Sequence, residues 1–278
     1  MSASGASRPV PAALARVEQV HLRAPVFVSD LHLCAARAAT LQRFCMLLEE
    51  LGGAAAELIV LGDLFEYWAG DDTLQPNADG AADDAVGRQV AHALARTAAR
   101  GTAVYLLHGN RDLLLGEEFL QAAGAQLLAD PAIAVLGDGQ RAQPTLLAHG
   151  DAYCTRDLPY QAFRRQARDR AFQAAFLARP LAERRALLGQ ARAQSQAFKQ
   201  QQSMEIMDVT PEAIDAALRA AGVRHMIHGH THRPARHEFT LDGTGATRWV
   251  LPDWELEASP TRGGGLRWVQ DALHEFAL

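Results

Sequence analysis

Residues 26–32 read Val-Phe-Val-Ser-Asp-Leu-His, and residues 58–63 read Leu-Ile-Val-Leu-Gly-Asp. In each segment a short apolar run ends directly in polar side chains. Apolar runs without alternation are typical of strands that are buried on both faces, as in parallel sheets. Each run is followed by a stretch with helical periodicity, at residues 40–51 and 83–100. This alternation predicts an α/β fold with a largely parallel sheet.

Three more apolar runs extend the pattern along the chain. They cover residues 104–107, 145–148 and 225–227. Between the last two runs, Thr210 and the proline after it predict the start of a helix, and Gly222 predicts its end. We expect a single domain built on these five strands.

The bulk composition is that of an ordinary globular protein. The chain has 278 residues, 49% hydrophobic and 21% charged, which suits one large domain and excludes global disorder. Residues 1–24 lack the apolar centre of a secretory signal, so we expect a poorly ordered or loosely packed extension before a domain at residues 25–278. Residues 236–269 alternate as in a β-meander.

Three cysteines without CxxC spacing fit a reducing cytosol.

Residues 156–204 break the strand–helix rhythm and predict a helical cap inserted into the domain. They are rich in Ala, Arg, Gln and Leu, which favour helices. Residues 156–202 hold ten Lys or Arg and three acids, which gives this segment a charge of +7. Because the whole chain has a net charge of −5, the rest of the chain carries −12. Such a block could face a phosphorylated ligand or an anionic membrane surface. A solvated helical face is the alternative interpretation.

Polar side chains follow all five apolar runs. They are Asp30 and His32 after the first run, Asp63 after the second, Asn110, Arg111 and Asp112 after the third, His149 and Asp151 after the fourth, and His228, His230 and His232 after the fifth. In open α/β sheets ligands bind beyond the carboxyl ends of the strands, so these side chains predict one polar site. Each element alone is more often a turn or a cap, but the five together predict metal binding.

Carboxylate, imidazole and amide ligands without cysteine suit Mn²⁺, Fe or Zn²⁺. A carboxylate can bridge two such ions, and a bridging water then becomes a hydroxide near neutral pH that can attack a phosphoryl group. Other histidines are expected to be ordinary surface or core residues, and His108 and His232 to be structural neighbours of the ligands. The ordinary ones are His21, His92, His225, His237 and His274.

Several longer motifs carry a family resemblance. They are SDLHL at 29–33, LGDLFEYWAGDD at 61–72, HGNRD at 108–112, HGDAYCTRD at 149–157, IMDV at 206–209 and HGHTHRP at 228–234. From about residue 26 onward the chain resembles calcineurin-like metallophosphoesterases, and among them the UDP-2,3-diacylglucosamine pyrophosphohydrolases of lipid A biosynthesis. The resemblance implies a four-layer α/β/β/α sandwich with a helical cap.

The resemblance also implies the ligands of two divalent ions, usually Mn²⁺. One ion would be held by Asp30, His32 and His230, the other by Asn110, His149 and His228, with Asp63 between them. The implied catalytic residues are Asp63, Asn110, Arg111 and His228. The implied substrate contacts are Asn110, Arg111, Asp157, Tyr160, Ser195, Lys199, Gln202 and His228. The chain departs from the family at Lys199 and Gln202, where an amide and an ammonium exchange positions.

The implied reaction converts UDP-2,3-diacylglucosamine to UMP and 2,3-diacylglucosamine 1-phosphate at the cytoplasmic face of the inner membrane. A metal-bridging hydroxide would attack the α-phosphorus. Many relatives carry His where this chain has Arg111, and we hypothesise that a guanidinium stabilises a phosphate leaving group that needs no proton. The alternative is that Arg111 merely pairs with Asp112. Phenylalanines and leucines of the cap, from Phe163 to Leu188, would seat acyl chains or pack the cap.

Other functions fit the sequence less well. A soluble phosphoesterase acting on nucleotides or dinucleoside polyphosphates would share the metal site but would not explain the apolar, basic cap. A metal-free scaffold would be expected to lack ligands. A nuclease is disfavoured because the rest of the chain is acidic and would repel nucleic acid. No protein partner is indicated.

Overall fold

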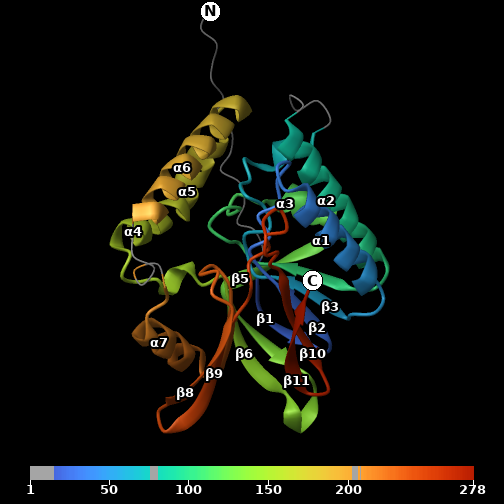
Figure 1. The fold of residues 1–278 in the computed structure, drawn as a ribbon, viewed down its shortest axis with the longest axis vertical. Coiled ribbons are helices and arrows are strands. Elements are labelled where there is room, and N and C mark those ends of the chain that lie inside the picture. Colours follow the sequence, from blue (N-terminus) through green and yellow to red (C-terminus); the bar gives the residue numbers. More distant parts are fainter. Residues whose placement is uncertain (1–15, 76–80, 202–205, 207) are drawn as a thin grey trace, which may run out of the picture.

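The computed structural model describes residues 16–75, 81–201, 206 and 208–278. Within these ranges, eleven strands form one curled, mixed sheet (Figure 1). They are β1 (Val17–Leu22), β2 (Pro25–Val28), β3 (Glu57–Val60), β4 (Ala103–Leu106), β5 (Ala125–Leu136), β6 (Gln143–Ala148), β7 (His225–His228), β8 (Ala235–Leu241), β9 (Thr244–Val250), β10 (Gly264–Val269) and β11 (Ala272–Ala277). Their order is β11-β10-β2-β3-β4-β5-β6-β7-β9-β8, and β1 pairs with β5 outside this path.

Helices connect most of the parallel strands. They are α1 (Ala38–Leu51), α2 (Ala82–Ala99), α3 (Glu117–Ala123), α4 (Leu158–Ala167), α5 (Arg170–Leu177), α6 (Leu181–Gln201) and α7 (Pro211–Ala221). Short 3-10 turns lie at Asp71–Leu74, Gly139–Arg141 and Asp151–Tyr153. The predicted helices at residues 40–51 and 83–100 are confirmed, as is the helix between Thr210 and Gly222.

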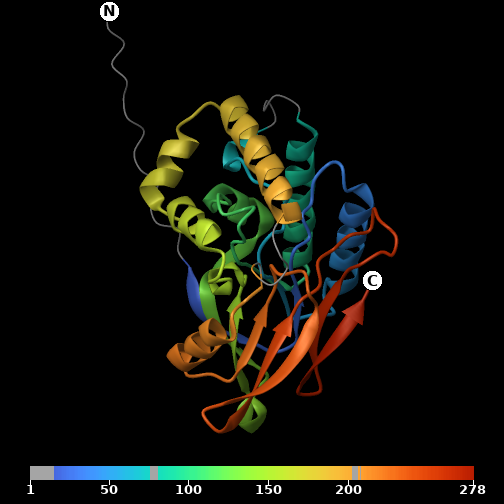
Figure 2. The ribbon, with the colours of Figure 1, turned by 60° about the vertical axis from the view of Figure 1, so that its left-hand side comes forward.

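The sheet bends along β5, whose first residues pair with β4 and whose last residues pair with β6. The two halves enclose an inner core that includes Phe27, Ile59 and Leu147. Helices α1, α2 and α3 cover the outer face of one half around Phe44, and α7 covers the other half through Leu218 (Figures 1 and 2). The predicted four-layer α/β/β/α sandwich is therefore confirmed.

Strand β1 corrects the expected N-terminal boundary. Residues 17–22 pair in parallel with β5, and Leu22 is only 1% exposed. The prediction of a loosely packed extension over residues 1–24 is wrong for this strand, because Val20 and Leu22 alternate into the inner core. Residues 1–15 lie outside the described part of the chain.

The C-terminal strands do not form the predicted meander. The β8–β9 hairpin lies at one edge of the sheet, whereas the β10–β11 hairpin lies near the other edge, with β10 antiparallel to β2. The connecting segment crosses between them and buries Trp254 completely. The Trp254 indole donates to the Gly264 carbonyl at 3.0 Å, so this side chain anchors the crossing by burial and by a hydrogen bond.

The cap consists of α4, α5 and α6, which Figure 2 shows in yellow and orange as a group at the end of the molecule away from β8 and β11. Its helical composition was predicted correctly over residues 158–201. Among the described residues, none of the helices combines the length and the apolar character needed to cross a membrane.

Much of the cap's positive charge is directed at the catalytic domain. Five cap arginines form ion pairs with carboxylates of the loops that follow β3 and β6, of β5 and of α2. The pairs are Arg164 and Arg168 with Asp130 and Asp151, Arg184 with Asp72, Arg185 with Asp84, and Arg192 with Glu66. These pairs make the cap and the acidic remainder electrostatically complementary, and they account for part of the charge asymmetry of the sequence.

Replacing Arg184 with alanine is expected to loosen the cap. Arg184 is 2% exposed and donates to the Ala69 carbonyl as well as to Asp72, so its loss leaves a buried carbonyl unpaired. We expect about 1–3 kcal/mol of lost stability in urea unfolding, with faster proteolysis of the cap. Arg179→Ala, which removes an exposed pair with Glu183, is the control and should cost less than about 1 kcal/mol. Equal effects of the two changes would contradict the anchoring role of Arg184.

Candidate metal centre

The ends of β2, β3, β6 and β7 bring potential metal ligands together. The ligand atoms of Asp30, Asp63 and His149 lie within 4.8 Å of one another, and so do those of Asp30, His32 and His232. Asp30 and His149 are completely buried. The two groups share the Asp30 carboxylate, so side chains from separate strand ends form one continuous cluster.

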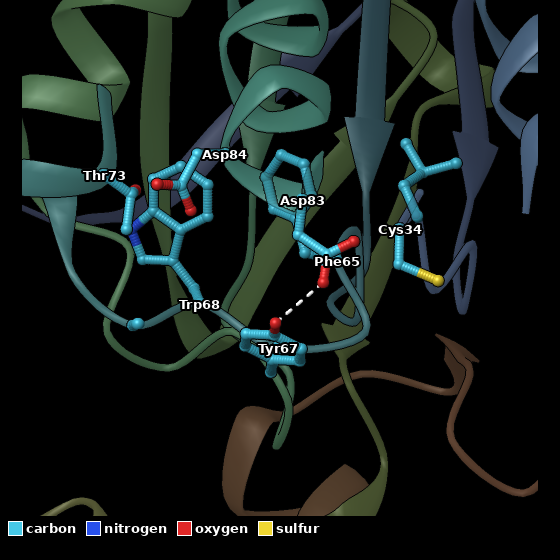
Figure 3. Close-up of a pocket in the computed structure, with 9 residues that line it drawn as sticks. Cys34, Phe65, Tyr67, Trp68, Thr73, Asp83 and Asp84 are labelled. Atoms are coloured by element: carbon cyan, nitrogen blue, oxygen red, sulfur yellow. Dashed lines mark hydrogen bonds between the residues drawn. The ribbon is translucent and has the colours of Figure 1, made fainter. Parts of the chain in front are cut away.

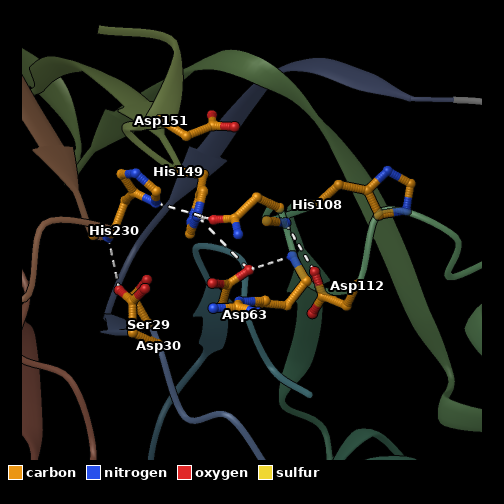
Figure 4. Close-up of polar contacts among 12 residues, drawn as sticks. Ser29, Asp30, Asp63, His108, Asp112, His149, Asp151 and His230 are labelled. Atoms are coloured by element: carbon orange, nitrogen blue, oxygen red, sulfur yellow. Dashed lines mark hydrogen bonds and ion pairs between the residues drawn. The ribbon is translucent and has the colours of Figure 1, made fainter. Parts of the chain in front are cut away.

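Asn110 and His230 complete this cluster. Figure 4 shows His230 beside His149 and Asp30. The Asn110 Oδ1 atom lies 3.0 Å from His149 Nε2 and 3.0 Å from His230 Nδ1. The backbone N–H of His230 donates to Asp30 Oδ2 at 2.9 Å. The structure therefore brings six of the seven expected ligands into mutual contact.

Two histidines of the HGHTH segment differ from expectation in their surroundings. His228, an expected ligand, is buried and belongs to neither of the two ligand groups, and its Nε2 accepts a hydrogen bond from Arg248 at 2.9 Å. His232, expected to be structural, lies 3.4 Å from Asp30 Oδ1 and 3.3 Å from His32 Nε2. The sequence signal for His232 was its place two residues after His230.

The backbone at this cluster adopts an uncommon conformation. Five non-glycine residues of the cluster have positive φ angles between 50° and 69°, namely Asp30, His32, Asp63, His230 and His232. Such residues cost about 1–3 kcal/mol each and concentrate at functional sites. Neighbouring glycines allow the close approach, since a Cβ on Gly109 would lie 2.0 Å from Asp63 Oδ1 and one on Gly229 would lie 2.2 Å from Asp30 Oδ2.

The electrostatics of the cluster fit divalent cations. Burial favours the neutral form of Asp30, yet the hydrogen bond and charge of His232, with other imidazoles, hold its pKa well below the usual range. Burial likewise favours neutral His149, but Asp63, Asp30 and Asp151 raise its pKa to about 9. Buried carboxylates thus demand positive charge here. Carboxylate, imidazole and amide donors without thiolates are suited to Mn²⁺, Zn²⁺ or Fe.

Comparison with known proteins agrees with this geometry. The sequence profile of the calcineurin-like phosphoesterase family matches residues 26–234, which is most of the chain. The chain belongs to this family. The matched range begins at β2 and ends just after the HGHTH segment, so it contains every strand end that contributes to the cluster.

Curated relatives in the family carry the name UDP-2,3-diacylglucosamine hydrolase. That of Bordetella pertussis is 45% identical over 264 residues, covering 94% of this chain and 98% of the relative. That of Aromatoleum aromaticum is 45% identical over 240 residues, covering 86% and 93%. That of Chromohalobacter salexigens is 46% identical over 256 residues, covering 91% and 97%. The similarity therefore includes the cap as well as the phosphoesterase core.

Arg111 does not pair with Asp112, so that alternative is wrong. The Asp112 carboxylate is completely buried and accepts hydrogen bonds from the backbone amides of Leu64 at 2.7 Å and Gly109 at 2.9 Å. The Arg111 amide donates to Asp63 Oδ1 at 2.9 Å. Asp112 therefore holds two strand-end loops together through backbone amides.

Glu66 is a neighbour of the cluster that the sequence analysis did not identify. It is buried, with Oε2 3.3 Å from His32 Nδ1 and Oε1 2.9 Å from Arg192 Nε. Burial opposes its ionisation, but His32 and the nearby Arg111 and Arg192 lower the pKa of Glu66 to about 2. A carboxylate at Nδ1 orients a ligating histidine and favours Nε2 as the metal-binding atom. Glu66 thus connects helix α6 of the cap to the cluster.

The expected substrate residues of the cap divide into two groups. The Tyr160 hydroxyl donates to Asp151 at 2.8 Å, and its ring centroid lies 5.8 Å from that of His230, so Tyr160 borders the cluster. Asp157 caps α4 by accepting from the Tyr160 amide at 3.0 Å. Gln202 lies outside the described residues, and the side chains of Ser195 and Lys199 are likewise not described.

A crevice beside the LFEYW segment does not extend the site. It is lined by residues that include Cys34, Trp68 and Thr73, and its volume is about 10 Å³, no more than one water molecule needs (Figure 3). The Tyr67 hydroxyl donates to Asp83 at 2.7 Å across it. These contacts hold the segment that carries Glu66 against α2.

Replacing Glu66 with glutamine is expected to weaken metal binding about tenfold or more, because the His32 ring loses the carboxylate that orients it. The measurement is Mn²⁺ affinity by isothermal titration calorimetry, which does not depend on turnover. Glu50→Gln, on the exposed face of α1, is the matched control and should bind Mn²⁺ as the wild type does. Unchanged affinity in Glu66→Gln would show that Glu66 does not position His32.

Proposed function

We propose that this protein hydrolyses the pyrophosphate bond of UDP-2,3-diacylglucosamine to give UMP and 2,3-diacylglucosamine 1-phosphate in lipid A biosynthesis. The observation that carries this proposal is the near-complete coverage of UDP-2,3-diacylglucosamine hydrolases at about 45% identity. The cluster of buried carboxylates and imidazoles supports it, because this chemistry requires metal-assisted phosphoryl transfer.

We assign the cluster to two divalent ions, most simply Mn²⁺. Asp30, His32 and His230 would hold one ion, with His232 as a further candidate. Asn110, His149 and His228 would hold the other, and Asp63 would bind both. Together the ions would lower the pKa of a bound water and offset the charge on the phosphoryl oxygens.

The chain's own groups orient the reactants. The Arg111 amide and the absence of a side chain at Gly109 fix the Asp63 carboxylate in place. The Arg111 guanidinium is assigned to the pyrophosphate, where it binds charge that builds on the departing phosphate. Tyr160, held by Asp151, closes the cap side of the site and limits access of bulk water. Attack on the α-phosphorus then releases UMP and leaves the phosphate on the sugar.

The cap is assigned to the acyl chains and to the membrane surface. Leu158, Phe163 and Phe172 are large apolar side chains with exposed fractions of 72%, 49% and 40%. They lie on α4 and α5 near the exposed Arg156 and Arg165. An apolar face bordered by arginines suits an interface with anionic lipid. We therefore place the enzyme at the cytoplasmic face of the inner membrane as a peripheral protein.

Hydrolysis of UDP-2,3-diacylglucosamine in detergent tests the proposed function. UMP release is expected to require Mn²⁺, to stop with EDTA and to fall at least about a thousandfold in Asp63→Ala, since several kcal/mol of charge stabilisation are lost. Asp242→Ala, in the exposed β8–β9 turn, is the control for removing an acid. Cleavage of dinucleoside polyphosphates but not of the lipid nucleotide would instead identify a soluble nucleotide phosphoesterase.

Replacing Arg111 with alanine is expected to lower kcat about 10²–10³-fold, because charge on the leaving phosphate loses its fixed donor. Arg111→Lys should recover part of the loss, since it keeps the charge but not the two-pronged geometry. Steady-state kinetics on the lipid nucleotide make the measurement. Wild-type kcat and KM in Arg111→Ala would remove this residue from the mechanism.

A further inference from the structure

A second pocket lies beside the metal centre, against β8 and β9. Its volume is about 280 Å³. It is lined by Asp208, Thr231, Arg233, Pro234, Ala235, His237, Arg248 and Val250. None of these residues was assigned to the site from the sequence, and His237 was expected to be an ordinary histidine.

The pocket is continuous with the reaction site. Arg248 lines it and donates to His228 Nε2 at 2.9 Å. Thr231 also lines it and stands between His230 and His232, which face the cluster of ligands. The pocket and the cluster are therefore joined through Arg248 and the HGHTH segment.

The chemical character of the lining identifies the kind of ligand. Within the described residues, Arg248 forms no ion pair with a carboxylate, although it is partly buried. The Thr231 hydroxyl is buried and has no hydrogen-bond partner in the described part of the chain. Asp208 and Arg233 form an ion pair at the wall, and Pro234 and Val250 add apolar surface. Such a lining suits a group that combines an anion, a polar-edged ring and hydroxyls, as a nucleotide does.

The position of the pocket separates it from the lipid side. The cap makes its ion pairs on β5 and α2 and on the loops that follow β3 and β6. The pocket lies beyond β7 in the sheet order, on β9 and β8. Its volume of about 280 Å³ is close to the lower limit of small-molecule pockets, about 300 Å³. The cap and the pocket are thus separate sites, one for the lipid end and one for the nucleotide end of the proposed substrate.

We infer that this pocket is the nucleoside subsite, which takes the uridine of the substrate and retains the UMP product. Arg248 lies at the α-phosphate end, and Thr231 and Asp208 provide hydrogen bonds to the base or ribose. The inference rests on the proposed function. The pocket, made by β8, β9 and the HGHTH segment, would select the nucleoside, whereas the cap is assigned to the lipid.

Binding of UMP tests the inference without the lipid substrate. Titration calorimetry on the Mn²⁺-loaded protein is expected to give about fivefold weaker UMP binding in Thr231→Val, which removes one hydrogen bond worth about 1 kcal/mol. His237→Ala should weaken UMP binding by a similar factor, because it removes a ring from the pocket wall. Glu238→Ala is the matched control, since it is the next residue on β8 and does not line the pocket.

Inorganic phosphate serves as the second probe. Its affinity should stay unchanged in Thr231→Val and His237→Ala, as should their Mn²⁺ affinity, which reports on the integrity of the metal centre. Failure of the wild type to bind UMP, unchanged UMP affinity in both variants, or equal weakening of UMP and phosphate would each overturn the inference. Failure of the proposed function would be seen separately, as absence of UMP release from UDP-2,3-diacylglucosamine by the wild type.

Discussion

The close approach of strand-end backbones around the Asp63 carboxylate is the constraint on which the site depends. Gly109 leaves no room for a Cβ beside this carboxylate, and the Arg111 amide donates to it. Asp63 occupies the left-handed backbone region, as do Asp30 and three histidines of the cluster, and this conformation positions the carboxylate at the strand end. The sandwich supplies the buried strands that stabilise these strained turns, and hence the geometry of the cluster.

Charge complementarity connects this cluster to the cap. Arg192 on α6 pairs with Glu66, and Glu66 faces the metal-centre histidine His32. At the other end of the cap, Arg164 and Arg168 pair with Asp151, which also accepts from Tyr160. The basic cap is therefore part of the environment of the candidate metal centre. In the function proposed above, the core would supply the chemistry, while the cap and the β8–β9 side would each take one end of the substrate.

The apolar runs predicted the parallel strands and one shared polar site, because each run ends in polar side chains and carboxyl ends of parallel strands meet at one edge. The four-layer sandwich was implied by the family resemblance. The sequence could not predict β1, whose short alternation at Val20 and Leu22 becomes informative only beside β5. The split of the C-terminal strands between opposite edges depends on burial of Trp254, a long-range contact. Glu66 and Arg248 were missed for the same reason, since their partners lie far away in sequence.

The central claim is that Asp63 and the converging strand ends hold two metal ions. Anomalous diffraction from crystals of the Mn²⁺-loaded protein tests it most directly. We predict two Mn²⁺ peaks about 3.5–4 Å apart, with the Asp63 carboxylate between them. A single peak, or two peaks of which neither contacts Asp63, would contradict the account.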